Sequence, residues 1–141
     1  MGSPDKTPAR VVIDCDTAIR IASEDIVPDP AIELLAPTLL RSHVLDTLFK
    51  RVRKGHLDEE RGLTINASFS KLKIRFLGDA VMRRRAWAIA DRQGLGTTEM
   101  AEYVALTLLQ ADALVTSDER LLAAAGGLVP LLDPLRLGKS R

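Results

Sequence analysis

Two aspartates follow short apolar runs that are typical of buried strands. Asp14 comes directly after "RVVI" at 10–13, and Asp118 comes directly after "ALVTS" at 113–117. Such β-branched and aliphatic runs indicate strands covered on both faces, as in a parallel sheet. The carboxyl ends of parallel strands meet at one edge, where open α/β folds bind their ligands. We therefore expect both carboxylates at that edge, within about 8 Å of each other, which one hydrated divalent cation can bridge.

Each aspartate alone also fits an ordinary helix cap or turn residue. Two at the same edge favour a cation site, because paired carboxylates repel each other unless a positive charge lies between them. Asp16 could add a third carboxylate if the strand continued past Asp14, since alternate residues of a strand share one side. Glu99 is a further candidate, in the first turn of a helix expected from about Thr98 to Ala111.

Other stretches predict helices that alternate with the strands. Apolar residues recur at helical spacing from Leu39 to Val52, with Pro37 in the first turn, and Thr17 could cap a shorter helix through "AIRIASE". Further helices are expected to begin at Asp58, Asp79 and Asp118, and "KIRFL" and "LVPLL" add strands. This alternation predicts an α/β fold with a central, mostly parallel sheet flanked by helices.

The length and composition indicate one soluble globular domain. The chain has 141 residues, of which 46% are hydrophobic and 28% charged, which excludes a disordered chain. We expect a flexible lead-in at 1–10, the domain at 11–133 and a C-terminal tail at 134–141. A single cysteine, Cys15, and the absence of a secretory signal or a long apolar run fit a cytoplasmic protein that does not enter a membrane.

A polyanion partner would have to meet a local patch, because the formal net charge is only +1. Three basic clusters could supply one. They comprise Lys50, Arg51, Arg53 and Lys54; Lys71, Lys73 and Arg75; and Arg83, Arg84 and Arg85. A solvated helix face is the competing explanation for each cluster.

Three stretches together resemble the PIN domain family, especially the VapC-type toxins of bacterial toxin–antitoxin pairs. They are "VVIDCDTAI", "LLAPTLLRSHVLDTL" and "AEYVALTLLQADALVTSDERLL", and the resemblance runs from about Val11 to about Leu132. It implies a three-layer α/β/α sandwich and a metal-dependent endoribonuclease that hydrolyses RNA phosphodiester bonds with Mg²⁺ or Mn²⁺. It also implies a small antitoxin partner and a homodimer, with a seam on the helices around 39–52 or 79–90.

The resemblance assigns the first and last acidic positions of the family to Asp14 and Asp118. The two middle positions differ, since His43 stands where a glutamate is usual and Met100 where an aspartate is usual. Asp16 or Glu99 could compensate, and Glu99 lies about 100° around the helix from Met100. Met100 itself fits buried packing, and His43 fits a surface position near Asp46 or Thr47.

Two hypotheses follow. In the first, the chain is a ribonuclease with a weakened site, in which Asp14, Asp118 and Glu99 are catalytic and Asp14, Asp118 and Asp16 hold Mg²⁺ or Mn²⁺. In the second, it is an inactive PIN-fold module that binds RNA or a protein. In both, the RNA contacts come from exposed basic residues, namely Lys50, Arg53, Arg83, Arg84 and Arg85.

Overall fold

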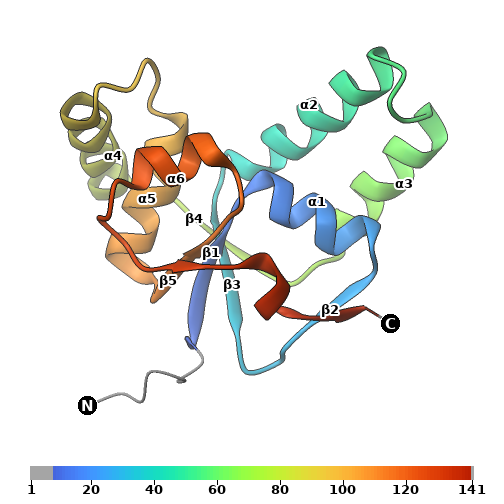
Figure 1. Cartoon of the computed structure of the whole chain (residues 1–141), viewed down its shortest axis with the longest axis horizontal. Helices are drawn as coiled ribbons and strands as arrows, with labels where there is room; N and C mark the ends of the chain where they lie inside the picture. The colour runs from blue at the N-terminus through green and yellow to red at the C-terminus, as the bar shows by residue number, and fades with distance from the viewer. Residues whose placement is uncertain (1–7, 141) are drawn as a thin grey trace.

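Five strands pair in parallel at the centre of the molecule (Figure 1), and the computed structural model describes residues 8–140. Their order across the sheet is β4-β3-β1-β5-β6. The strands are β1 (Arg10–Ile13), β3 (Glu33–Pro37), β4 (Ile74–Leu77), β5 (Ala113–Val115) and β6 (Leu131–Leu132). All four pairings between them are parallel, so the predicted parallel sheet is confirmed.

The helices form a layer on each face of the sheet. They are α1 (Cys15–Ser23), α2 (Leu40–Arg53), α3 (Glu59–Ser70), α4 (Ala80–Gln93), α5 (Glu99–Gln110) and α6 (Glu119–Ala125). Helices α1, α2 and α3 contact one another, while α5 lies against β1, β3 and β5 and also contacts α4 and α6. Right-handed crossovers from this strand order place the two groups on opposite faces. The fold is therefore a three-layer α/β/α sandwich.

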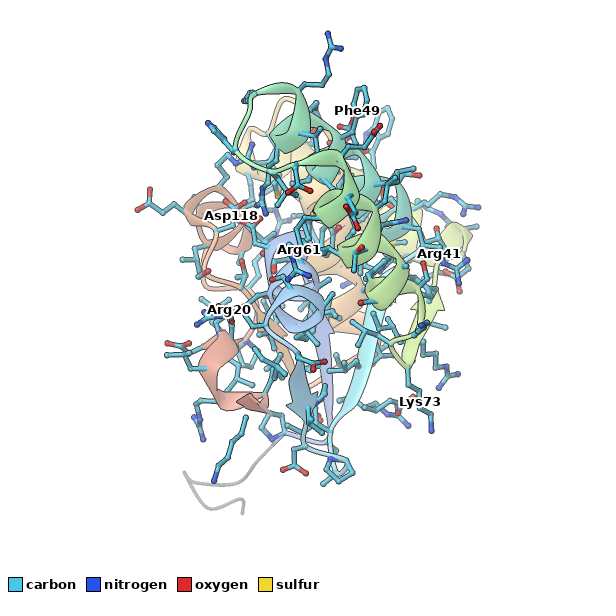
Figure 2. The ribbon with its side chains drawn as sticks, turned by 90° about the vertical axis from the view of Figure 1, so that its right-hand side faces the viewer. Arg20, Arg41, Phe49, Arg61, Lys73 and Asp118 are labelled. Carbon is cyan, nitrogen blue, oxygen red and sulfur yellow. The ribbon has the colours of Figure 1, made fainter. Side chains whose placement is uncertain are left out.

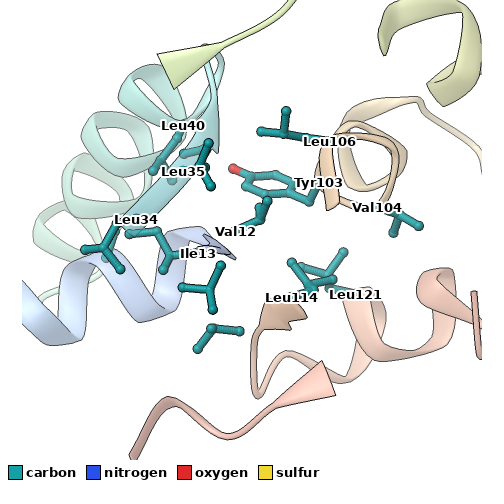
Figure 3. Packing of buried hydrophobic residues seen from close by; sticks show 14 of the residues in the cluster. Val12, Ile13, Leu34, Leu35, Leu40, Tyr103, Val104, Leu106, Leu114 and Leu121 are labelled. Carbon is teal, nitrogen blue, oxygen red and sulfur yellow. The ribbon is translucent and has the colours of Figure 1, made fainter. Parts of the chain in front are cut away.

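The core is continuous between the sheet and α5 (Figure 3). Val12 and Leu114 of the sheet are completely buried, and Tyr103 and Leu106 of α5 are at most 2% exposed. Burying side chains of this size contributes about 1.5–3 kcal/mol each. This packing fixes α5 on the sheet and brings its first turn to the carboxyl ends of the strands.

Most helix starts agree with the local capping pattern. Asp58, Asp79 and Asp118 each accept a hydrogen bond from a backbone N–H of the first turn, as predicted. Two predicted starts are wrong. Helix α1 is capped by Asp14 rather than Thr17, and Pro37 is the last residue of β3, paired with Leu77, rather than part of the first turn of α2.

The expected C-terminal tail at 134–141 is wrong for the residues that the structure describes. A 3₁₀ turn (η1, Pro134–Arg136) leads into β7 (Gly138–Ser140), which pairs antiparallel with β2 (Ile26–Pro28). Leu137 is completely buried, and its carbonyl oxygen accepts a hydrogen bond from the N–H of Asp29 at 2.8 Å. The three-residue strand is too short to carry a readable alternation, so the sequence gives no sign of it.

Candidate functional site

Asp14 lies where β1 ends and α1 begins. Its side chain is 4% exposed, and both oxygens are engaged. Oδ1 accepts a hydrogen bond from the N–H of Thr17 at 2.9 Å, and Oδ2 accepts one from the hydroxyl of Thr116 at 2.6 Å. Burial raises the pKa of this carboxyl, against the opposing effect of the hydrogen bonds from Thr116 and Thr17. The structure therefore favours the neutral form of Asp14 more than water does.

Asp118 is connected to Asp14 through Thr116. The hydroxyl that donates to Asp14 also accepts a hydrogen bond from the N–H of Asp118 at 2.9 Å. Since β1 and β5 pair in parallel through Ile13 and Val115, both aspartates follow adjacent strand ends. The prediction that they share one edge of the sheet is confirmed.

The carboxylate of Asp118 caps α6 and faces one arginine. Oδ1 accepts hydrogen bonds from the N–H groups of Arg120 and Leu121 at 2.8 and 3.4 Å, and Oδ2 lies 3.3 Å from Nη2 of Arg120. Burial acts to raise the pKa of Asp118, but the hydrogen bonds from Arg120 and Leu121, together with the charge of Arg120, outweigh it and lower the pKa below its usual value. Asp118 therefore stays ionised more readily than Asp14.

A pocket of about 260 Å³ opens between these two residues and the helices around them. Three carboxylates line it, from Asp14, Asp16 and Asp118. The rest of its lining comes from α1, α2, α5 and α6, namely Cys15, Thr47, Arg51, Met100, Tyr103, Arg120 and Leu121. The pocket thus combines three acidic groups with two guanidinium groups and an apolar wall.

Asp16 lines the pocket from a helix and not from a strand, which differs from the expectation. The strand ends at Ile13, so Asp16 lies in the first turn of α1 and not on a continued strand beside Asp14. Its side chain is 48% exposed, and Oδ1 lies 3.3 Å from Nη2 of Arg51. The sequence indicated Asp16 as a residue of the site, but it did not indicate that Arg51 forms an ion pair with its carboxylate.

Glu99 and His43 pair with each other and do not line the pocket. Oε2 of Glu99 lies 3.6 Å from Nε2 of His43, while Nδ1 of His43 is hydrogen-bonded to the hydroxyl of Tyr103 at 2.9 Å. The rings of His43 and Tyr103 also stack, with centroids 5.9 Å apart. Burial lowers the pKa of His43, against an opposing effect of Glu99. The expected nearness to Asp46 agrees with the effect of the Asp46 charge on the pKa of His43, whereas the hydrogen bond to Tyr103 was not expected.

Met100 and Cys15 form inert parts of the pocket. Met100 contributes to the wall and packs against the core, in agreement with the packing role predicted for it. Burial raises the pKa of the Cys15 thiol to about 11, and its sulfur lies 3.3 Å from the hydroxyl of Thr47. A thiol with such a pKa is not a nucleophile near neutral pH.

The residues present do not fit a resident Mg²⁺ or Mn²⁺ ion. Within residues 8–140, no group of three or more His, Cys, Asp or Glu side chains is arranged to hold a metal. Hard divalent cations take several oxygen ligands, ideally from ionised carboxylates. Here Asp14 is buried and bonded on both oxygens, and Asp16 and Asp118 each face an arginine.

Exposed basic residues stand on two helices beside this pocket. Lys50 and Arg53 lie in the last turn of α2, the helix that also supplies Arg51, while Arg83, Arg84 and Arg85 lie on α4. In Figure 1, α2 and α4 stand on opposite sides of α6. Lys50 also pairs with Asp46 at 2.8 Å. The basic residues therefore flank the carboxyl edge without lining the pocket itself.

Comparison with known proteins gives a fold and no family. No protein-family model matches the chain, and no curated protein matches it either. The chain is similar to the crystal structure of PAE2754 from Pyrobaculum aerophilum, with a TM-score of 0.67 and 22% sequence identity over 90% of each chain. At that identity the similarity shows the three-layer fold alone. Among the described residues, no helix has the length and apolar character needed to cross a membrane.

Proposed function

We propose that this protein is a PIN-type RNA-binding module whose acidic site is too weak for efficient catalysis. The proposal combines the resemblance of three stretches to the PIN family with the geometry of the pocket. One observation carries it: the residues at the two middle acidic positions do not supply ligands. Met100 is a wall of the pocket, and His43 is bonded to Tyr103 and Glu99.

RNA binding is tested by its dependence on salt. Replacing Arg83, Arg84 and Arg85 together by alanine is expected to lower the affinity for single-stranded RNA about tenfold and to make the salt dependence shallower. The physical reason is that each neutralised phosphate releases a counterion, which contributes about 0.7 to the slope of log K against log salt. Fluorescence anisotropy of a labelled RNA across a salt titration measures both quantities.

The matched control removes three other positive charges. Lys71, Lys73 and Arg75 precede or begin β4, at the amino end of that strand and so away from the carboxyl edge. Their combined replacement by alanine is expected to leave the slope nearly unchanged. Equal losses in the two triple variants would point to net charge alone, and no loss in the Arg83–Arg85 variant would leave those arginines as a solvated helix face.

A weak, Mn²⁺-preferring endoribonuclease is the second candidate. The observation that favours it is that Asp14, Asp16 and Asp118 all line one pocket at the carboxyl edge of the sheet. Mg²⁺ demands near-ideal octahedral oxygen coordination, which three carboxylates on different elements supply poorly, so Mn²⁺ is expected to serve better here. In this candidate Asp14→Asn or Asp118→Asn abolishes a readily measured cleavage, whereas the RNA-binding module cleaves too slowly for either substitution to change RNA turnover noticeably.

A homodimer is proposed on the basis of exposed apolar side chains on α2 and α4. Leu45 and Phe49 are 53% and 60% exposed, and Val81 and Trp87 are 55% and 71% exposed. Figure 2 shows Phe49 at the outside of the molecule. Light scattering at micromolar concentration is expected to give the mass of a dimer. Phe49→Glu is expected to give a monomer if α2 forms the seam, and Trp87→Glu is expected to do so if α4 forms it. A monomer before any substitution would contradict the proposal.

A small antitoxin is a further proposed partner, which the family resemblance implies. RNA and an antitoxin would both be met in the cytoplasm, the location expected from the sequence. The adjacent gene tests this proposal, because toxin–antitoxin pairs are encoded together. A neighbouring gene for a small DNA-binding protein would support it, and its co-purification with this chain would show the complex directly.

A further inference from the structure

Two arginines from separate elements turn toward the acidic pocket. Arg51 comes from the last turn of α2 and pairs with Asp16, and Arg120 comes from the first turn of α6 and pairs with Asp118. Both N···O distances are 3.3 Å. The two arginine side chains are 40% and 80% exposed, so each extends from solvent to the rim of the pocket.

These guanidinium groups balance the charge of the carboxylates that remain ionised. Asp118 raises the pKa of Arg120, and Asp16 acts on it in the same direction at longer range. The positive charge of Arg51 also acts on Cys15, at the inner side of the pocket. Asp14 needs no arginine, because Thr17 and Thr116 bond its oxygens and burial favours its neutral form. No carboxylate of the pocket is left without a compensating partner.

We propose that Arg51 and Arg120 are the internal counter-ions of this pocket and that a divalent cation enters only by displacing them. A cation placed between Asp16 and Asp118 would lie close to two positive charges, which repel it. It would also have to break both ion pairs, each of which is partly exposed and therefore weak enough to open. This role concerns the cation alone and does not depend on whether the protein binds RNA.

The test measures binding of Mn²⁺ alone, by electron paramagnetic resonance of the free ion and by calorimetry. The variant Arg51→Gln with Arg120→Gln removes both guanidinium groups and keeps side chains of similar length. It is expected to bind Mn²⁺ about tenfold more tightly than the unmodified protein, because two repulsive charges and two competing pairs are gone. Adding Asp16→Asn or Asp118→Asn to this variant is expected to remove much of the gain, because these are the carboxylates that the arginines release.

The matched control is Lys54→Gln with Arg92→Gln, which lowers the net charge equally at two exposed positions outside the pocket. Its Mn²⁺ affinity is expected to stay unchanged. Circular dichroism establishes that each variant is folded, and Arg120→Gln alone gives a milder variant with a smaller gain. The proposal is overturned if the folded Arg51 and Arg120 variants bind Mn²⁺ no more tightly than the unmodified protein, or if the control gains as much.

Discussion

Replacing Asp14 with alanine is expected to lower the free energy of unfolding by about 2–4 kcal/mol. The substitution removes the N-cap of α1 and leaves the buried hydroxyl of Thr116 without its acceptor. The substitution also removes the hydrogen-bonded connection from Asp14 through the hydroxyl of Thr116 to the N–H of Asp118. Urea denaturation followed by circular dichroism, in the presence of EDTA, measures the change without any contribution from bound metal.

Asp118→Ala is the matched control, because it also removes an N-cap aspartate but at a more exposed position. Its loss is expected to be about 1 kcal/mol, typical of an ordinary cap. If the two losses were equal, the burial of Asp14 and its bond to Thr116 would add nothing to the cap.

The pH dependence of Asp14→Asn gives a check on the same interaction. Because the folded pKa of Asp14 is raised, its contribution to stability is full below the unfolded pKa and is lost as pH rises through the folded pKa. The stability difference between the unmodified protein and Asp14→Asn is therefore expected to shrink as the pH rises from the unfolded pKa of an aspartate, about 4, through the raised folded pKa. The lowered pKa of Asp118 predicts the opposite trend for Asp118→Asn.

Local patterns made several of these features predictable from the sequence. An N-cap bonds the backbone two or three residues ahead, so Asp58, Asp79 and Asp118 could be recognised from a few neighbouring residues. The buried runs before Asp14 and Asp118 placed both at strand ends for the same reason. Because parallel strands end at one edge of the sheet, the shared position of Asp14 and Asp118 could be predicted without knowledge of tertiary contacts.

The missed features are contacts between residues far apart in the chain. Thr116 bonds Asp14 across 102 residues, His43 bonds Tyr103 across 60, and Arg51 reaches Asp16 across 35. No periodicity or capping rule reports such pairs, because they depend on how α2, α5 and the strand ends pack. Asp16 illustrates the limit, since its nearness to the pocket was expected but its place on a helix and its arginine partner were not.

The substitution Met100→Asp is expected to raise Mn²⁺-dependent cleavage of single-stranded RNA at least about tenfold, which corresponds to about 1.4 kcal/mol of barrier. Met100 already lines the pocket with Asp14 and Asp118, so an aspartate there adds a carboxylate where the pocket lacks one. His43→Glu is expected to add little, because it would place a second carboxylate beside Glu99 and outside the pocket. Cleavage of a labelled RNA by the single and double variants, across titrations of Mn²⁺ and Mg²⁺, measures both effects.

Leu108→Asp is the matched control, since it adds the same charge to the same helix at a 41% exposed position outside the pocket. It is expected to leave cleavage at the level of the unmodified protein, and Asp14→Asn is expected to cancel the gain from Met100→Asp. Strong Mg²⁺-dependent cleavage by the unmodified protein would show that its existing carboxylates suffice, against the RNA-binding proposal. If neither Met100→Asp nor its combination with His43→Glu cleaves RNA, the missing carboxylates are not the only loss. Asp14 and Asp118 then remain as the caps of α1 and α6, linked to each other through the hydroxyl of Thr116.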